Sequence, residues 1–427
     1  MGRRRGQVGT VERPGSFAPR RRQRCCRASE ERQLMTAYEF SVPFNGDPGT
    51  LDALLKLRGR DGNAIREVYL NAPQSVTGSG RVGAETTERA FVETVERIHD
   101  GGVRADITMN STCEGAEWYD RETVSRQVGF VRRMHEERGV EAVTLANPFL
   151  IERVRDACPA IEISASVLAD IDCFSRAEAY ARAGASTVTV DTSANKDLKL
   201  LRQMTDRLGV EIKLMVNEGC LDKCPYRKFH MNYISHKSRE TASEGMAFSF
   251  ACGDIILRDP GQVFKSNWVR PEDLVRYEKI TRFFKIVGRD MLPSKVLRCT
   301  QAYLDESYEG NLFDILCSSI GFYGIEHSAH VDNKALDRTS HFKRTSTCNR
   351  RCHTCTYCDD LARDLLGYGW VTRENLEDLG RYGTIAAIEA RFGGRYPRCP
   401  AFAERPTETP TETRRNHDTA DQNLARA

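Results

Sequence analysis

The densest group of reactive side chains in this chain of 427 residues is a run of four cysteines near its C-terminal end. The run reads Cys348-Asn-Arg-Arg-Cys352-His-Thr-Cys355-Thr-Tyr-Cys358, so four thiols fall within eleven residues. Thiolates at this spacing bind soft metals, and four of them complete a zinc site or hold one iron–sulfur cluster. The neighbouring arginines favour the deprotonated form of the thiols, which is the form that binds metal. We therefore predict that Cys348, Cys352, Cys355 and Cys358 bind a metal.

A second group of cysteines, Cys220, Cys224 and Cys252, lies further upstream. Cys220 and Cys224 follow directly after an apolar run that predicts a strand, and a proline follows Cys224, as it follows many iron–sulfur ligands. These three thiols are also predicted metal ligands, one short of the usual four. Cys113, after an earlier strand, or the C-terminal run would supply the fourth. The alternative is three separate buried thiols, because free cysteine is among the most buried residue types.

Another interpretation of the C-terminal run is a radical S-adenosylmethionine motif, C-x₃-C-x₂-C, which Cys348, Cys352 and Cys355 match. In those enzymes the motif lies near the first barrel strand, whereas this run follows the last predicted strand. The Cys220/Cys224 pair has Arg227 in place of the third cysteine of such a motif.

Short apolar runs that alternate with amphipathic segments must position these cysteines. Such runs, rich in Val, Ile, Leu, Thr or aromatic residues, are typical of strands. Regular alternation of strand and helix predicts parallel strands, and eight units predict a TIM-type (β/α)₈ barrel. No glycine-rich dinucleotide fingerprint follows the first run, which disfavours a doubly wound open sheet. The predicted strands are Tyr38–Val42, Glu67–Leu70, Ala105–Met109, Ala142–Ala146, Glu162–Ser166, Thr187–Val190, Ile212–Val216 and Phe284–Val287.

Polar residues follow most of these strands, where the mouth of a barrel carries its active site. We predict substrate-binding or cofactor-binding roles for Asn110, Asn147 and Asp191. About sixty residues separate strands seven and eight, and a long insertion on the mouth side of a barrel is usually functional. The predicted catalytic residues lie in or beside this insertion: Glu218, Tyr226, His230 and Arg289. Arg289 would pair with a carboxylate, and Tyr226 and His230 would donate protons.

The organisation of the chain follows from composition. Residues 36–310 form the predicted barrel, and 311–403 form a cysteine-rich extension. Segments 1–34 and 404–427 are predicted to be disordered, with Met35 as an alternative start. The first 32 residues hold ten Arg and three Glu, so the rest of the chain carries a net charge of −4 within the total of +3. This mildly acidic body gives no indication of direct nucleic-acid binding, although the basic head could act as a nucleic-acid arm. Neither an export signal nor a membrane span is found, so we predict a cytoplasmic protein with reduced thiols.

Two motifs of the chain resemble peptidase family U32, the collagenase-like family of unassigned catalytic type. They are Asn217–Arg227, where the strand runs into the cysteine loop, and Pro271–Arg289. The resemblance covers residues 36–310 and implies a barrel with a 4Fe–4S cluster beneath its mouth. Cys220 and Cys252 match the first and third cluster cysteines of the family. Cys224 lies earlier than the second cysteine of the family, the Trp268 region lacks the fourth, and Asn217-Glu218 replaces a histidine motif.

The resemblance implies two functions, and a third interpretation stands beside them. The first is oxygen-independent hydroxylation, or a related redox modification, of a small molecule or an RNA, with one or two 4Fe–4S clusters. The second is peptidase activity, although the chain has no Gly-x-Ser-x-Gly and no His-Glu-x-x-His motif. The third is a non-catalytic subunit, with a cluster or zinc as scaffold, in a heteromeric complex with a partner of the same family.

Overall fold

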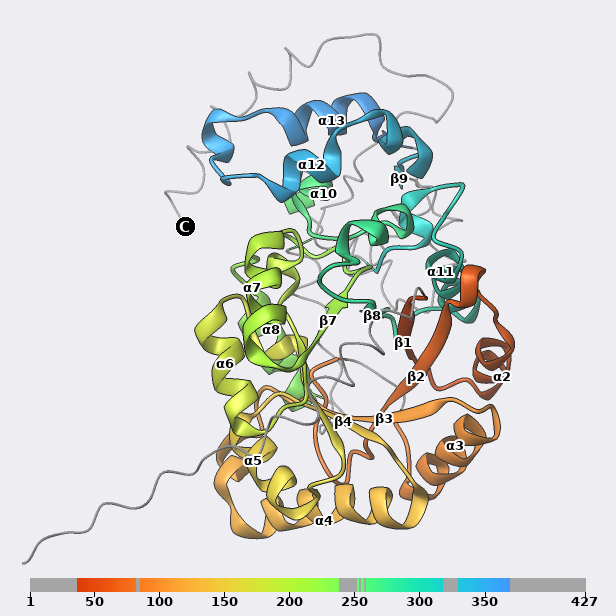
Figure 1. Ribbon diagram of the computed structural model, residues 1–427, viewed down its shortest axis with the longest axis vertical. Helices are drawn as coiled ribbons and strands as arrows, with labels where there is room; N and C mark the ends of the chain where they lie inside the picture. Colours follow the sequence, from red (N-terminus) through yellow and green to blue (C-terminus); the bar gives the residue numbers. More distant parts are fainter. Residues whose placement is uncertain are drawn as a thin grey trace, which may run out of the picture. The chain divides into compact units, whose positions relative to one another are not determined.

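Eight parallel strands close into a barrel in which β1 pairs with both β2 and β8 (Figure 1). The computed structural model describes residues 37–81, 85–237, 252, 255–256, 259–317 and 329–368. Segments 1–34 and 404–427, and the alternative start at Met35, lie outside this range. The predicted (β/α)₈ barrel is confirmed, and each strand lies within three residues of its predicted start. The strands are β1 Glu39–Pro43, β2 Ala64–Asn71, β3 Arg104–Met109, β4 Ala142–Leu145, β5 Glu162–Ala165, β6 Thr187–Thr189, β7 Glu211–Met215 and β8 Phe283–Lys285.

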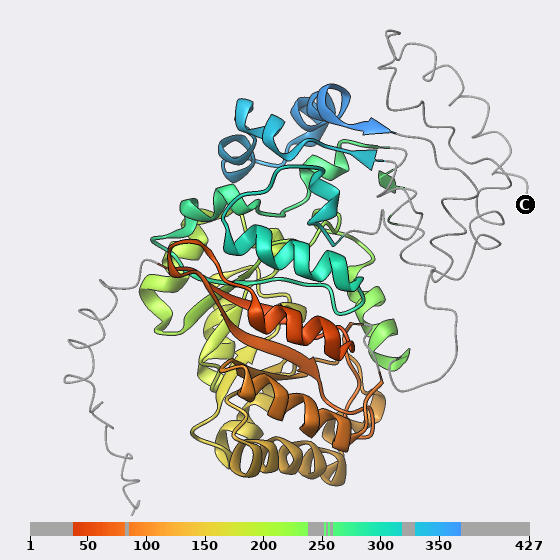
Figure 2. The same ribbon diagram turned by 90° about the vertical axis from the view of Figure 1, so that its right-hand side faces the viewer.

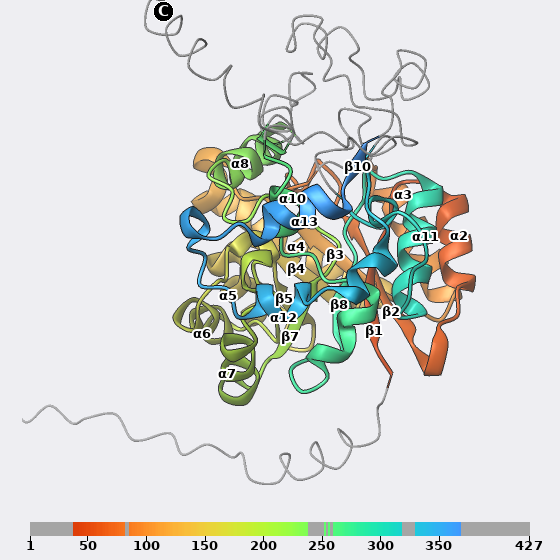
Figure 3. The same cartoon turned by 90° about the horizontal axis from the view of Figure 1, so that it is seen from above.

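Helices surround this ring of strands when it is seen from above (Figure 3). On one side, α11, α2 and α3 pack in series (Figure 2). Local signals define their ends: the Asp120 carboxylate accepts a hydrogen bond from the amide of Thr123 at the start of α4, and Gly139 ends that helix with φ of 70°. The barrel helices are α2 Pro48–Lys56, α3 Glu88–Asp100, α4 Arg121–Arg138, α5 Pro148–Ala157, α6 Phe174–Ala183, α7 Leu198–Leu208, α8 Arg227–Lys237, α10 Gln262–Lys265 and α11 Pro293–Leu304.

The hydrophobic core lies between the strands and these helices. Alternate strand residues point outward, and they are almost completely buried by the helices, as at Val68, Ile107 and Leu214. The other half of each strand points into the barrel, where the side chains are largely polar. Branched apolar side chains usually fill the interior of such barrels. This barrel therefore keeps its apolar core outside the ring of strands and a polar core within it.

The C-terminal segment packs against the insertion that follows β7. Its elements are β9 Ala329–His330, α12 His341–Ser346, α13 Tyr357–Leu365 and β10 Gly367–Tyr368, and β9 pairs with β10 antiparallel. Lys265 in α10 forms an ion pair of 3.1 Å with Asp359 in α13, and His341 stacks on Trp268 with ring centroids 4.8 Å apart. Figure 1 shows α12 and α13 beside α10. In the described part of the chain, no helix is long and apolar enough to span a membrane.

Candidate functional site at the barrel mouth

The loop after β7 begins with two polar residues, Asn217 and Glu218, that have different roles. The side-chain amide of Asn217 donates to the carbonyl of Val287 at 3.0 Å and accepts from the amide of Val287 at 2.7 Å. Asn217 therefore clamps the end of β7 to the end of β8. The next residue, Glu218, points into a group of charges and is only 2% exposed.

Two arginines from separate parts of the mouth neutralise Glu218. Arg81, after β2, forms an ion pair with it, and the Arg227 guanidinium lies 3.1 Å from its second oxygen. The hydroxyl of Thr192 donates to the same oxygen at 3.2 Å. Arg227 also lies 3.3 Å from the carboxylate of Asp191. A buried charge is stable only when it is paired in this way.

A pocket of about 210 Å³ opens beside this network. Carboxylates of Asp170 and Asp191, the amine of Lys223, the guanidinium of Arg227 and the thiol of Cys224 are among its lining groups. Burial raises the pKa of Asp170, although the charge of Arg227 opposes the shift. The pocket thus combines both signs of charge with a thiol, as a site for a polar ligand requires.

The three upstream cysteines lie in the same part of the mouth, and two of them are in direct contact. The thiol of Cys252 is hydrogen-bonded to Cys224, which lowers the pKa of Cys224 to about 6, and the charge of Cys220 also acts on Cys252. Cys317 comes close through the backbone, because Gly219 donates to its carbonyl at 2.7 Å. Across the ranges that the structure describes, no three Cys, His, Asp or Glu side chains stand close enough together to hold a metal ion. The predicted metal sites therefore stay predictions.

The C-terminal cysteine run also reaches the mouth. Arg350, between Cys348 and Cys352, pairs with Asp222 and donates to the carbonyl of Ser193 at 2.8 Å. Asp222 and Ser193 adjoin the pocket described above. Cys348, Cys352 and Cys355 are exposed and Cys358 is half-buried. Burial raises the pKa of Cys358 to about 11, with smaller contributions of opposite sign from Lys265 and Lys196.

The three substrate-binding residues predicted from the sequence lie at the mouth, and each has an internal partner, which for Asp191 is Arg227. The amide of Asn110 accepts from the backbone of Gly80 and donates to Ser166 at 3.2 Å. The side chain of Asn147 accepts from the amide of Phe149 and so begins α5. These contacts do not test whether Asn110 and Asn147 bind a substrate or a cofactor. That role stays a prediction for both residues.

The predicted proton donors differ in environment. Tyr226 is 37% exposed. His230 is partly buried, and burial together with the charges of Arg81 and Arg227 lowers its pKa to about 4. Its imidazole is therefore neutral at pH 7. The predicted role of both residues in proton transfer stays untested.

The sequence interpretation missed the charged groups inside the barrel. Lys213 in β7 forms an ion pair of 2.7 Å with Glu67 in β2, and Lys285 in β8 lies 3.9 Å from Asp106 in β3. These pairs join strands that are not neighbours, so they cross the interior. The sequence carried a signal for them, because polar residues alternate with apolar ones in part of the barrel strands, as in Ala105-Asp-Ile-Thr-Met.

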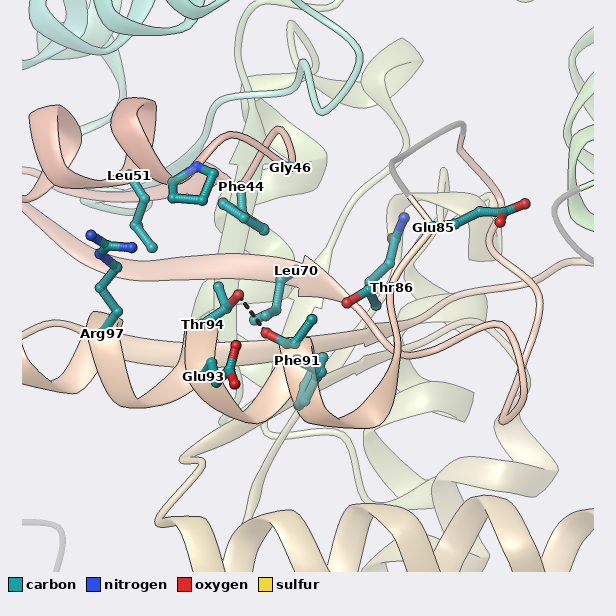
Figure 4. Close-up of a pocket in the computed structure, with 13 residues that line it drawn as sticks. Phe44, Gly46, Leu51, Leu70, Glu85, Thr86, Phe91, Glu93, Thr94 and Arg97 are labelled. Carbon is teal, nitrogen blue, oxygen red and sulfur yellow. Dashed lines mark hydrogen bonds between the residues drawn. The ribbon is translucent and has the colours of Figure 1, made fainter.

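A separate pocket of about 230 Å³ lies outside the barrel, between α2 and α3 (Figure 4). Phe44, Leu51, Leu70 and Phe91 give it a largely apolar lining, and Glu85 and Arg97 lie at its edge. This pocket lies between helices, away from the charged residues at the barrel mouth and from the cysteines.

The closed ring of parallel strands with a charged mouth defines a (β/α)₈-barrel protein. Within this class, the model of peptidase family U32 matches residues 60–243, which confirms the predicted resemblance. Over this segment the chain is similar to peptidase family U32.

Comparison with individual proteins gives one curated relative and several solved structures. The chain is 28% identical over 339 residues to "Uncharacterized protease MJ1657" of Methanocaldococcus jannaschii, across 77% of this chain and 98% of the relative. The solved U32 peptidase Mk0906 is similar with a TM-score of 0.45 and 17% identity, across 66% of this chain and 96% of its own. A chitinase of Rhizomucor miehei, RmChi1, has a TM-score of 0.36 and 11% identity, across 62% and 99%.

Proposed function

We propose that this protein is an iron–sulfur enzyme of the U32 type that carries out oxygen-independent hydroxylation, or a related redox modification, of a small molecule or an RNA. The observation that carries this proposal is that Cys220, Cys224 and Cys252 lie in the same part of the barrel mouth, beside the charged pocket. Every described cysteine is a free thiol, in keeping with a reducing, cytoplasmic setting.

The donor set suits a cluster better than a hard metal ion. Thiolates select iron–sulfur clusters or zinc, and the hydrogen bond from Cys252 favours the thiolate form of Cys224. A cluster held by these residues would supply electrons to the pocket. Lys223 and Arg227 on the pocket wall would attract an anionic substrate, while the paired Glu218 keeps Arg227 in place.

The thiol of Cys113 contacts His236 at 2.9 Å, so we propose two other candidate sources for the fourth thiol. Cys317 lies beside the cysteine loop, because its backbone pairs with Glu218 and Gly219. The C-terminal run is tied to the same loop through Arg350 and Asp222. One arrangement is a mouth cluster completed by Cys317 with a second cluster or zinc in the run, and the other is a single cluster shared between loop and run.

Anaerobic purification tests the proposal. We expect brown protein with a broad visible absorbance and about four irons and four sulfides for each cluster. Cys220→Ser and Cys224→Ser should lose the mouth cluster, whereas the matched variant Cys158→Ser, of a buried thiol at the end of α5, should keep it. Loss of half the iron in Cys348→Ser would indicate two clusters. Colourless protein with stoichiometric zinc in the wild type would overturn the redox function.

Peptidase activity is the second candidate, and one contact favours it. The thiol of Cys113 lies 2.9 Å from a ring nitrogen of His236, which is the geometry of a nucleophile beside its base. The thiolate would attack a peptide carbonyl, and His236 would protonate the departing amine. Cys113→Ala should then abolish hydrolysis of a fluorescent gelatin substrate while the cluster absorbance stays unchanged. Hydrolysis at the wild-type rate in Cys113→Ala would exclude this pair as the catalytic group.

A further inference from the structure

A lysine amine lies buried in the interior of the barrel near its mouth. Lys285 is the last residue of β8, the end of the strand that faces the active-site side of such barrels. Its side chain is 9% exposed. The amine lies 3.6 Å from the centre of the Tyr69 ring and 3.9 Å from the carboxylate of Asp106. The second of these distances is too long for a hydrogen bond, so the amine is not tightly bound by its neighbour.

The guanidinium of Arg289 faces the same ring of Tyr69, with its carbon 5.6 Å from the ring centre. Arg289 is 5% exposed, and its Nη1 has no hydrogen-bond partner among the described residues. Within that same part of the chain, Oδ1 of Asp106 and the hydroxyl of Thr108 are buried without a partner. Buried polar groups are nearly always hydrogen-bonded, and each that is not costs about 1–3 kcal/mol. Unpaired donors and acceptors that face one another across the barrel interior therefore indicate a place for a small polar ligand.

We propose that Lys285 is an imine-forming amine for a small carbonyl compound that carries a carboxylate, with Arg289 as the carboxylate anchor. The proposal names a substrate class for the barrel and rests on the proposed function only in placing that substrate at the same mouth. Arg289 contributes a planar fork of donors that matches a carboxylate.

The chemistry needs no reagent beyond the two partners. The lone pair of the amine attacks the carbonyl carbon, and the new C–N bond gives a carbinolamine. The C–O bond then breaks, both amine protons end on the departing oxygen, and one water leaves as the C=N bond forms. Asp106 can relay these protons through its unpaired oxygen, because burial and the charge of Glu67 raise its pKa.

Electrostatics keep a share of the amine neutral at physiological pH. Burial, together with the charges of Lys213 and Arg289, lowers the pKa of Lys285 to about 7, against the opposing charges of Asp106 and Glu67. Only the neutral amine is a nucleophile.

The barrel provides its own control lysine. Lys213 is also fully buried, but its amine is held at 2.7 Å by the carboxylate of Glu67. A buried ion pair of that length keeps the amine engaged. Modification should therefore distinguish Lys285 from Lys213.

The experiment is reductive trapping of full-length, anaerobically purified protein with glyoxylate and cyanoborohydride, read by peptide mass mapping. Acetaldehyde is the matched carbonyl without a carboxylate. We expect one dominant adduct on Lys285, formed at least about tenfold faster with glyoxylate than with acetaldehyde. Arg289→Met should remove that preference, and Lys285→Arg should remove the adduct. The rate should rise as pH increases through about 7.

Adducts spread over exposed lysines such as Lys228, with none on Lys285 of the wild type, would overturn the inference. Equal rates with the two aldehydes would overturn the role of Arg289. Cluster absorbance is recorded on the same samples, so brown protein without the adduct refutes the imine alone. Colourless protein that forms the adduct refutes the redox function alone. Because the wild-type map decides the outcome, a variant that fails to fold does not affect it.

Discussion

Replacing Lys213 by methionine removes one half of the ion pair that crosses the barrel interior. Lys213 and Glu67 are 1% and 2% exposed and their charged atoms lie 2.7 Å apart. Methionine keeps the length of the side chain but leaves the carboxylate of Glu67 without its closest cation. The expected result is a large loss of stability, because a buried charge without a partner is costly.

The size of this loss can be derived in two ways. Burial alone would raise the pKa of Glu67, but the charges of Lys213 and Lys285 lower it from 4.5 to about 2. That fall corresponds to about 3 kcal/mol. Breaking a buried ion pair by removing one partner typically costs about 3–5 kcal/mol. The two figures agree, so we expect Lys213→Met to lower the free energy of unfolding by about 3 kcal/mol.

Urea unfolding at pH 7, followed by far-ultraviolet circular dichroism, measures this loss. The double variant Lys213→Met/Glu67→Leu leaves no charge unpaired in this pair and should recover most of the stability. A loss below about 1 kcal/mol in the single variant, or costs that simply add in the double variant, would refute the reasoning.

The pH dependence gives an independent check. The folded-state pKa of Glu67 is lower than its unfolded-state value, so its stabilising contribution is present above pH 4.5. The contribution is lost as pH falls from about 4.5 through about 2. Glu67→Leu should therefore flatten the acid side of the stability profile in this window relative to the wild type.

Three further predictions concern the mouth. Arg227→Met leaves Glu218 with one cation fewer and should cost about 1–3 kcal/mol in urea unfolding, whereas an unchanged midpoint would mean that the pair contributes nothing. Asn147→Ala should lower the stability of the fold by about 1 kcal/mol through loss of the α5 cap, and Asn147→Ser should restore it; if the serine variant stays destabilised, the cap is not the cause. Arg350→Ala breaks the contact with Asp222, so trypsin should cleave the C-terminal segment faster while the unfolding midpoint stays nearly constant; equal cleavage rates would show that other contacts hold the segment.

The fold could be predicted because its signals are local. Four or five residues of suitable type mark each strand, and glycines such as Gly139 and Gly184 directly follow α4 and α6. The residues at the mouth could also be predicted, because all parallel strands of a barrel end at the same face. Each of these features depends only on residues that lie nearby in the sequence.

The partners of the site residues could not be predicted in this way. Glu218 pairs with Arg81 and Arg227, and Arg81 lies 137 residues away along the chain. The sequence likewise does not show whether the C-terminal cysteine run lies at the mouth. The contact between Arg350 and Asp222, which are 128 residues apart, places it there. Contacts over such separations depend on how loops pack above a closed barrel.

The sequence by itself determined the eight strands, the helices between them and the cysteines that a metal would require. Only the tertiary structure decided which charges meet inside the ring, as with Lys213 and Glu67 or Lys285 and Asp106. The physical reason is that the alternation along a strand specifies which side chains point inward. Closure of the barrel, with β8 against β1, specifies which of them lie opposite one another.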